Sequence, residues 1–121
     1  MSEKNNYDLS YLKEISEGDD VFVKEMVTQF TTDAPEFISL MKKFAREKDW
    51  KNLFSTVHRF ASNIDFVGVQ GGRELVDIIE DNARNEKDPE KTVELTLRLV
   101  DYCEQAREQL LVDFQLNTAK Y

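Results

Sequence analysis

The stretch Asp49–Gly68, DWKNLFSTVHRFASNIDFVG, contains His58, the only histidine of the 121-residue chain. Apolar residues recur in it at alternating steps of three and four, the spacing of one buried face of an α-helix. The stripe consists of Trp50, Leu53, Val57, Phe60, Ile64 and Val67. Asp49 can cap the start of such a helix, and Gly68 can end it in a left-handed conformation. His58 follows Val57 and therefore lies about 100° round the helix from it, on the flank of the buried stripe.

The composition excludes several classes of function. The chain has 24 acidic and 16 basic residues and a net charge of −8, so we expect neither nucleic-acid binding nor a basic membrane-binding face. No apolar run approaches the ~18–20 residues that cross a bilayer. The opening MSEKNNYDLS is polar and lacks a hydrophobic signal core, which favours a cytoplasmic protein. A single cysteine, Cys103, rules out an intramolecular disulfide and is typical of a small buried residue.

Upstream of the histidine stretch, the pattern predicts a short helix that ends near Gly18 and a longer helix capped by Asp19 or Asp20. The apolar stripe of the longer helix again runs by threes and fours: Val23, Met26, Phe30, Ala34, Phe37, Met41 and Phe44. Pro35 lies inside this pattern, and a proline in a helix interior removes a hydrogen bond and clashes with the preceding turn. We expect a kink or brief break near residues 32–35, with a hairpin as the less favoured alternative.

Two further helices are predicted after Gly68. The first becomes regular around Arg73, and the second starts with Asp88 as N-cap and Pro89 in the first helical position. The apolar face of the first consists of Leu75, Val76, Ile78, Ile79 and Ala83. The broad face of the second consists of Val93, Leu95, Leu97, Leu99, Val100, Cys103, Ala106, Leu110, Leu111 and Phe114.

These elements predict an all-α fold, an antiparallel four-helix bundle with a short extra N-terminal helix. The whole chain, residues 1–121, is expected to form one domain, with loose tails at 1–6 and 117–121. Strand-like alternation and internal repeats are both lacking, and the four glycines and two prolines are few.

The sequence offers little support for most enzyme chemistry. It has no Glu-x-x-His pair for a metal and no P-loop, so neither a metal cofactor nor autonomous kinase activity is expected. The sequence also lacks the nucleophile-elbow motif that would present a catalytic serine. What remains is His58, because an exposed neutral imidazole is a competent nucleophile near pH 7. The plain alternative is a solvated surface histidine.

The surrounding residues resemble the histidine-containing phosphotransfer (HPt) domain, the four-helix module of multistep two-component phosphorelays. The resemblance covers roughly residues 8–115, and the piece FVKEMVTQFTTDAPEFISLMKKFAREKDWKNLFSTVH is similar to the region leading to the family's histidine. Gly68, ten residues after His58, matches the family's helix-ending glycine, and Leu75 with the IIE triplet ending at Glu80 resembles the next helix. The resemblance implies that His58 takes a phosphoryl group from a receiver-domain aspartate and passes it to another. The implied partners are a response-regulator receiver and a hybrid histidine kinase, with Mg²⁺ held by the receiver.

The resemblance fails at one position. The family commonly has lysine three residues after the histidine and a small residue at the fourth, whereas this chain has Ala61 and Ser62. Arg59 is the local candidate for neutralising the phosphoryl group, and the Ser55 and Ser62 hydroxyls could donate hydrogen bonds to it. The alternative is that all three side chains simply face water.

Glu80 is the second candidate at the site, because family members often place Glu or Gln there to hydrogen-bond the histidine Nδ1. Such a carboxylate would leave Nε2 free as the nucleophile. The alternative is a solvated helix carboxylate. Phe54, Ser55 and Ala61, which surround His58 on the helix, are predicted to contact the receiver.

Two other functions stay open. The missing lysine could mark an HPt-like adaptor that binds a receiver or kinase without transferring phosphate, and the chain could also be a structural helical interaction module. A phosphorylated shuttle is the preferred interpretation, as a monomer and as a free-standing protein or a fragment of a hybrid kinase.

Overall fold

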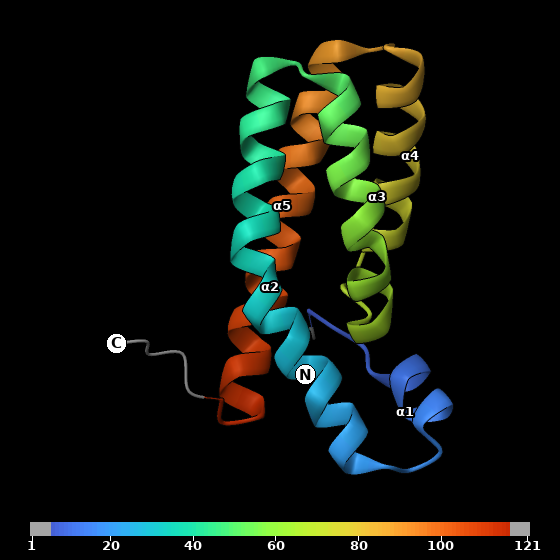
Figure 1. Ribbon diagram of the computed structural model, residues 1–121, viewed down its shortest axis with the longest axis vertical. Coiled ribbons are helices and arrows are strands. Elements are labelled where there is room, and N and C mark those ends of the chain that lie inside the picture. The colour runs from blue at the N-terminus through green and yellow to red at the C-terminus, as the bar shows by residue number, and fades with distance from the viewer. Residues whose placement is uncertain (1–5, 117–121) are drawn as a thin grey trace, which may run out of the picture.

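A computed structural model of the protein describes residues 6–116, and these form five α-helices without a strand (Figure 1). The helices are α1 (Ser10–Ser16), α2 (Asp20–Glu47), α3 (Trp50–Val67), α4 (Gly72–Asn85) and α5 (Pro89–Asp113). The four long helices run alternately up and down, and both α2 and α4 pack against α3 and α5. The short α1 packs on α2 and α3. The predicted four-helix bundle with a short extra N-terminal helix is confirmed.

The ends of α3 match the sequence prediction. The Asp49 carboxylate accepts a hydrogen bond from the Asn52 N–H at 3.3 Å, and Gly68 is left-handed with φ of 62°. The Asp8 N–H donates to the Gly68 carbonyl at 2.9 Å, and a Cβ on Gly68 would collide with the Asp8 backbone. Glycine therefore serves twice here, because it ends α3 and lets the N-terminal segment lie directly on that end.

The other predicted helix ends are also confirmed. The Asp19 carboxylate caps α2 by accepting hydrogen bonds from two backbone N–H groups, and α1 ends near Gly18, with a left-handed Glu17 as its C-cap. Asp88 holds the N-cap position of α5 and Pro89 follows it in the helix, although the Asp88 side chain makes no capping hydrogen bond. Its own backbone is left-handed, and its carbonyl accepts bonds from the N–H and the hydroxyl of Thr92, both at 2.8 Å.

Pro35 does not interrupt α2, which runs unbroken from Asp20 to Glu47. The predicted break and the hairpin are both wrong, although the helix changes direction between its first turns and the upright remainder (Figure 1). Proline removes the N–H that would bond the Thr31 carbonyl. Arg107 of α5 supplies a replacement, because its Nε–H donates to that carbonyl at 2.7 Å.

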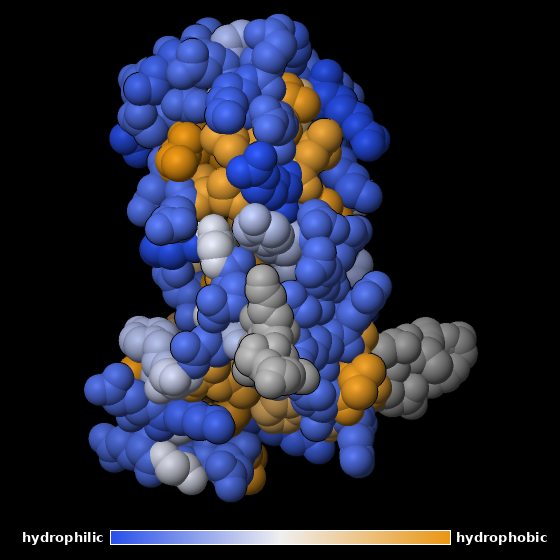
Figure 2. Space-filling view, turned by 180° about the vertical axis from the view of Figure 1, so that it is seen from behind, coloured by the Kyte–Doolittle hydropathy of each residue, from blue (hydrophilic) through white to orange (hydrophobic). Residues whose placement is uncertain are grey.

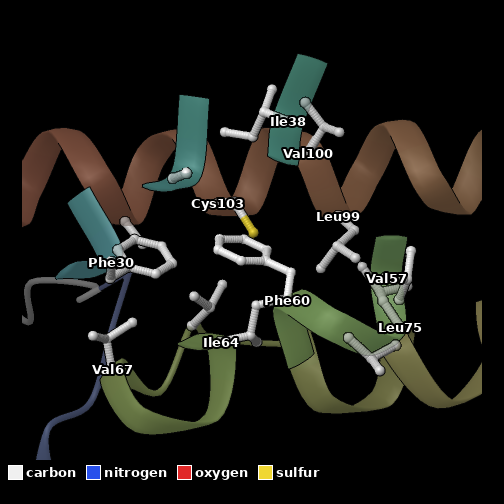
Figure 3. Close-up of a cluster of buried hydrophobic side chains, with 14 of the residues drawn as sticks. Phe30, Ile38, Val57, Phe60, Ile64, Val67, Leu75, Leu99, Val100 and Cys103 are labelled. Atoms are coloured by element: carbon white, nitrogen blue, oxygen red, sulfur yellow. The ribbon is translucent and has the colours of Figure 1, made fainter. Parts of the chain in front are cut away.

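The core lies between the four long helices, with Phe60 of α3 near its centre (Figure 3). The Phe60 ring is stacked with Phe30 at 5.6 Å and with Phe37 at 4.6 Å between centroids. Cys103 of α5 is fully buried beside it, as the sequence predicted, and burial raises the pKa of the thiol to about 12. This packing fixes the rotation of α3, since a buried Phe60 directs the residue two positions earlier, His58, towards solvent.

The buried faces of α2 and α4 differ in part from the predicted stripes. Burial on α2 extends to Val27, Ile38 and Ala45, whereas three predicted members of the stripe are only half-buried: Met26, Phe37 and Phe44. The reason is that α2 packs against two helices, so its buried face is centred between them. Ile78, predicted to be buried in α4, is 45% exposed.

The surface of the side opposite to the view of Figure 1 is mostly hydrophilic, with separate apolar areas (Figure 2).

The two predicted tails fall largely outside the described residues, which leave out 1–5 and 117–121. Asn6 is part of the fold, because its backbone and side-chain N–H groups donate to the Gln109 side chain at 3.0 and 3.2 Å. No helix within residues 6–116 is both long and apolar enough to cross a bilayer.

Candidate functional site

His58 projects from the middle of α3 into solvent. Its side chain is 66% exposed, while its neighbour Val57 and the nearby Phe60 are fully buried. The imidazole therefore stands on a helix whose opposite side is locked into the core. A nucleophile held in this way is accessible to a large partner without any opening of the fold.

Glu80 reaches His58 from α4. The distance between His58 Nδ1 and Glu80 Oε2 is 3.2 Å, and the Glu80 side chain is only 17% exposed. An ionised carboxylate can only accept, so a neutral imidazole in this contact carries its proton on Nδ1 and its lone pair on Nε2. The structure thus brings together the two residues that the sequence had proposed as nucleophile and orienting group.

An aromatic ring and a cation extend the site along the same side. The Phe54 ring lies one turn before His58 and stacks on the imidazole with centroids 5.6 Å apart and planes 9° from parallel. The guanidinium of Arg84, a residue of α4, lies over the Phe54 ring, 4.9 Å from its centroid. Arg84 was missed by the sequence analysis. Its spacing of four residues from Glu80, which puts both on one face of α4, was the available signal.

The family model described as Hpt domain matches residues 25–109, which include the whole of this site. The chain belongs to the Hpt domain family. No curated protein and no solved structure matched in the corresponding comparisons. The suspected family is thereby confirmed, and the Hpt domain identifies the chain as a histidine phosphotransfer module of a phosphorelay.

The small residues of this Hpt domain surround His58 as the helical spacing predicted. Ser55 and Ser62 are exposed one turn before and one turn after the histidine, and Ala61 is half-buried. Neither hydroxyl has a hydrogen-bond partner within residues 6–116. Both are therefore available to a group bound at the imidazole, and their predicted roles remain predictions.

Arg59 is directed away from the imidazole. Its guanidinium lies over the Phe37 ring of α2, 5.4 Å from the centroid, whereas His58 contacts α4 on the other side of α3. The structure does not bring Arg59 and His58 together, because adjacent residues on a helix point about 100° apart. Its proposed role beside the phosphoryl group is therefore a prediction without a supporting contact.

The described residues 6–116 hold no group of three or more His, Cys, Asp or Glu side chains arranged for a metal ion. What the arrangement offers is a single accessible nitrogen, oriented by a carboxylate and flanked by a ring, two hydroxyls and an arginine.

Proposed function

We propose that His58 is the phospho-accepting residue of a phosphorelay shuttle. Its Nε2 lone pair attacks the phosphorus of an aspartyl phosphate on a receiver domain, a P–N bond forms, and the P–O bond to aspartate breaks. The aspartate leaves as a carboxylate. The reverse sequence on a second receiver carries the phosphoryl group onward.

The contact between His58 and Glu80 is the observation that supports this proposal. Attack through Nε2 places positive charge on the ring, and a carboxylate 3.2 Å from Nδ1 stabilises that charge while holding the proton there. Phosphoryl transfer otherwise needs positioning and electrostatic stabilisation rather than further covalent chemistry. In this proposal the receiver contributes the acidic residues and the Mg²⁺.

The exposed surface round His58 is where the receiver would dock in this proposal. Phe54, Ser55 and Ala61 would contact it, forming a small apolar centre with a polar rim. We propose that the protein acts in the cytoplasm as a monomer, without a resident cofactor and without transferring phosphate from ATP itself. A hybrid histidine kinase would load the first receiver.

The decisive experiment follows phosphate from a phosphorylated receiver to the wild-type protein and to His58→Gln. Acid-labile, base-stable label is expected on the wild type, and at least about 100-fold less on the variant because no other histidine exists. Circular dichroism should show both proteins equally folded, since His58 is exposed. Equal label on both proteins would refute the assignment of His58. Receiver binding without label would instead support the adaptor function that Ala61 suggested.

A further inference from the structure

The phosphorylated site would carry an unbalanced negative charge. A phosphoryl group on His58 brings up to two negative charges to a place where the nearest ionised side chain is the Glu80 carboxylate. The Ser55 and Ser62 hydroxyls can donate hydrogen bonds but supply no charge. The site therefore needs a cation that can reach the phosphoryl oxygens from the open side of the imidazole.

Only a few cations lie near His58 among the described residues. Lys51 is two turns away along α3, about 10 Å measured along the helix axis. Arg59 lies against Phe37 on the α2 side. Arg84 differs from both, because it lies over the ring of Phe54, and that ring is the one stacked on the imidazole.

Arg84 forms no ion pair with any other residue of the described range 6–116. Its acidic neighbour Asp81 is paired with Lys87 at 2.8 Å. That lysine is the main reason why the pKa of Asp81 is lowered, and Arg84 contributes less. The guanidinium is exposed, and its contact with Phe54 is weaker than a bidentate, charge-assisted bond to a phosphoryl group. It can therefore leave the ring when an anion arrives.

We propose that Arg84 is the residue that neutralises the phosphoryl group on His58. In the unphosphorylated protein its guanidinium rests on Phe54, and after transfer it binds the phosphoryl oxygens on Nε2. This assigns to α4 both electrostatic functions of the site, since Glu80 holds the ring and Arg84 holds the phosphate. The inference rests on the proposed function in one respect, which is that His58 carries the phosphoryl group.

Phosphoramidate tests this without a receiver, because it transfers its phosphoryl group to an imidazole nitrogen and releases ammonia. The initial rate of His58 phosphorylation would be measured for the wild type and for Arg84→Ala, Arg84→Lys and Arg84→Glu. Arg59→Ala is the matched control, because Arg59 is also an exposed arginine over a phenylalanine ring. ¹⁵N NMR of the arginine Nε groups before and after phosphorylation reports contact directly.

We expect Arg84→Ala to be slower by about fivefold, the upper end for an exposed ion pair, and Arg84→Glu by about 25-fold. Arg84→Lys should fall between the wild type and Arg84→Ala, because lysine keeps the charge but not the bidentate geometry. Arg59→Ala should stay within about twofold of the wild type, and the Nε signal of Arg84 alone should shift. Equal rates for Arg84→Ala and the wild type, or equal slowing by Arg84→Ala and Arg59→Ala, would overturn the role of Arg84. Labelling by phosphoramidate but not by receivers would leave Arg84 in place and refute the shuttle. A wild type that phosphoramidate cannot label would overturn both.

Discussion

The α3–α4 seam and the α2–α5 seam are both antiparallel helix pairs, and one cross-helix polar contact in each seam has a role that the other lacks. In the α3–α4 seam, Glu80 contacts an exposed His58 and leaves its second ring nitrogen open. In the α2–α5 seam, Arg107 reaches the Thr31 carbonyl, a buried acceptor that Pro35 has deprived of its helical partner.

The difference shows how one architecture separates function from stability. The bond from Arg107 to Thr31 in the α2–α5 seam satisfies a backbone group that would otherwise be buried without a partner, so it contributes to folding. In the contact between Glu80 and His58 of the α3–α4 seam, the histidine is 66% exposed, and an ion pair or hydrogen bond with a solvated partner contributes little to folding. The contact between Glu80 and His58 can therefore serve catalysis without a large effect on stability. Substitutions in the two seams should separate activity from stability.

The largest effect is expected from Arg107→Ala, which leaves the Thr31 carbonyl unpaired. We expect the free energy of unfolding to fall by about 2 kcal/mol, with the rate of His58 phosphorylation unchanged. Urea denaturation followed by circular dichroism measures the loss.

Pro35→Ala provides the check on that prediction, because an alanine N–H can bond the Thr31 carbonyl within the helix. In the Pro35→Ala background, Arg107→Ala should cost less than about 1 kcal/mol. Equal losses in both backgrounds would show that Arg107 stabilises the protein by packing rather than through this carbonyl.

A smaller effect is expected from Glu80→Ala, this time on activity. Without the carboxylate the imidazole can rotate and exchange tautomers, so phosphorylation of His58 should slow by about tenfold. Stability should change by less than about 1 kcal/mol, because the partner that Glu80 loses, His58, is 66% exposed. Phosphoramidate labelling and urea denaturation measure the two effects.

The control for this prediction is Glu74→Ala, which removes an exposed carboxylate from the same helix and should be labelled at the wild-type rate. If Glu74→Ala were phosphorylated as slowly as Glu80→Ala, the change in net charge, and not the lost orientation of the imidazole, would explain the slower rate.

The smallest effect is expected from Lys42→Ala in the α2–α5 seam. Lys42 and Glu104 form an ion pair at 3.7 Å in which both side chains are substantially exposed. Removing it should change the free energy of unfolding by less than about 0.5 kcal/mol. The same urea titration measures this, next to Arg107→Ala. A loss as large as that of Arg107→Ala would mean that cation charge along this seam, and not the backbone bond, holds α2 to α5.

Local periodicity correctly predicted much of the fold and the exposure of His58. The stripe through Val57 and Phe60 placed α3 and its caps correctly, and it put His58 on the exposed flank. It was less accurate on α2, where burial extends to Val27 and Ile38 and Phe37 is only half-buried. It failed at Pro35, where the loss of a helical bond is local but its replacement comes from a residue 72 positions later, Arg107.

The sequence by itself determined that α3 presents His58 to solvent, because the period of a helix fixes which side chains share a face. The family resemblance named Glu80 as a partner of the imidazole, but only the tertiary structure placed Glu80 against it, brought Arg84 to the same side and directed Arg59 away. Arg59 is adjacent in sequence and points to α2, whereas Glu80 and Arg84 lie on the side of the imidazole. The reason is that neighbours across a seam depend on the axial offset and rotation of two helices, which the packing of their buried faces sets and no local pattern records.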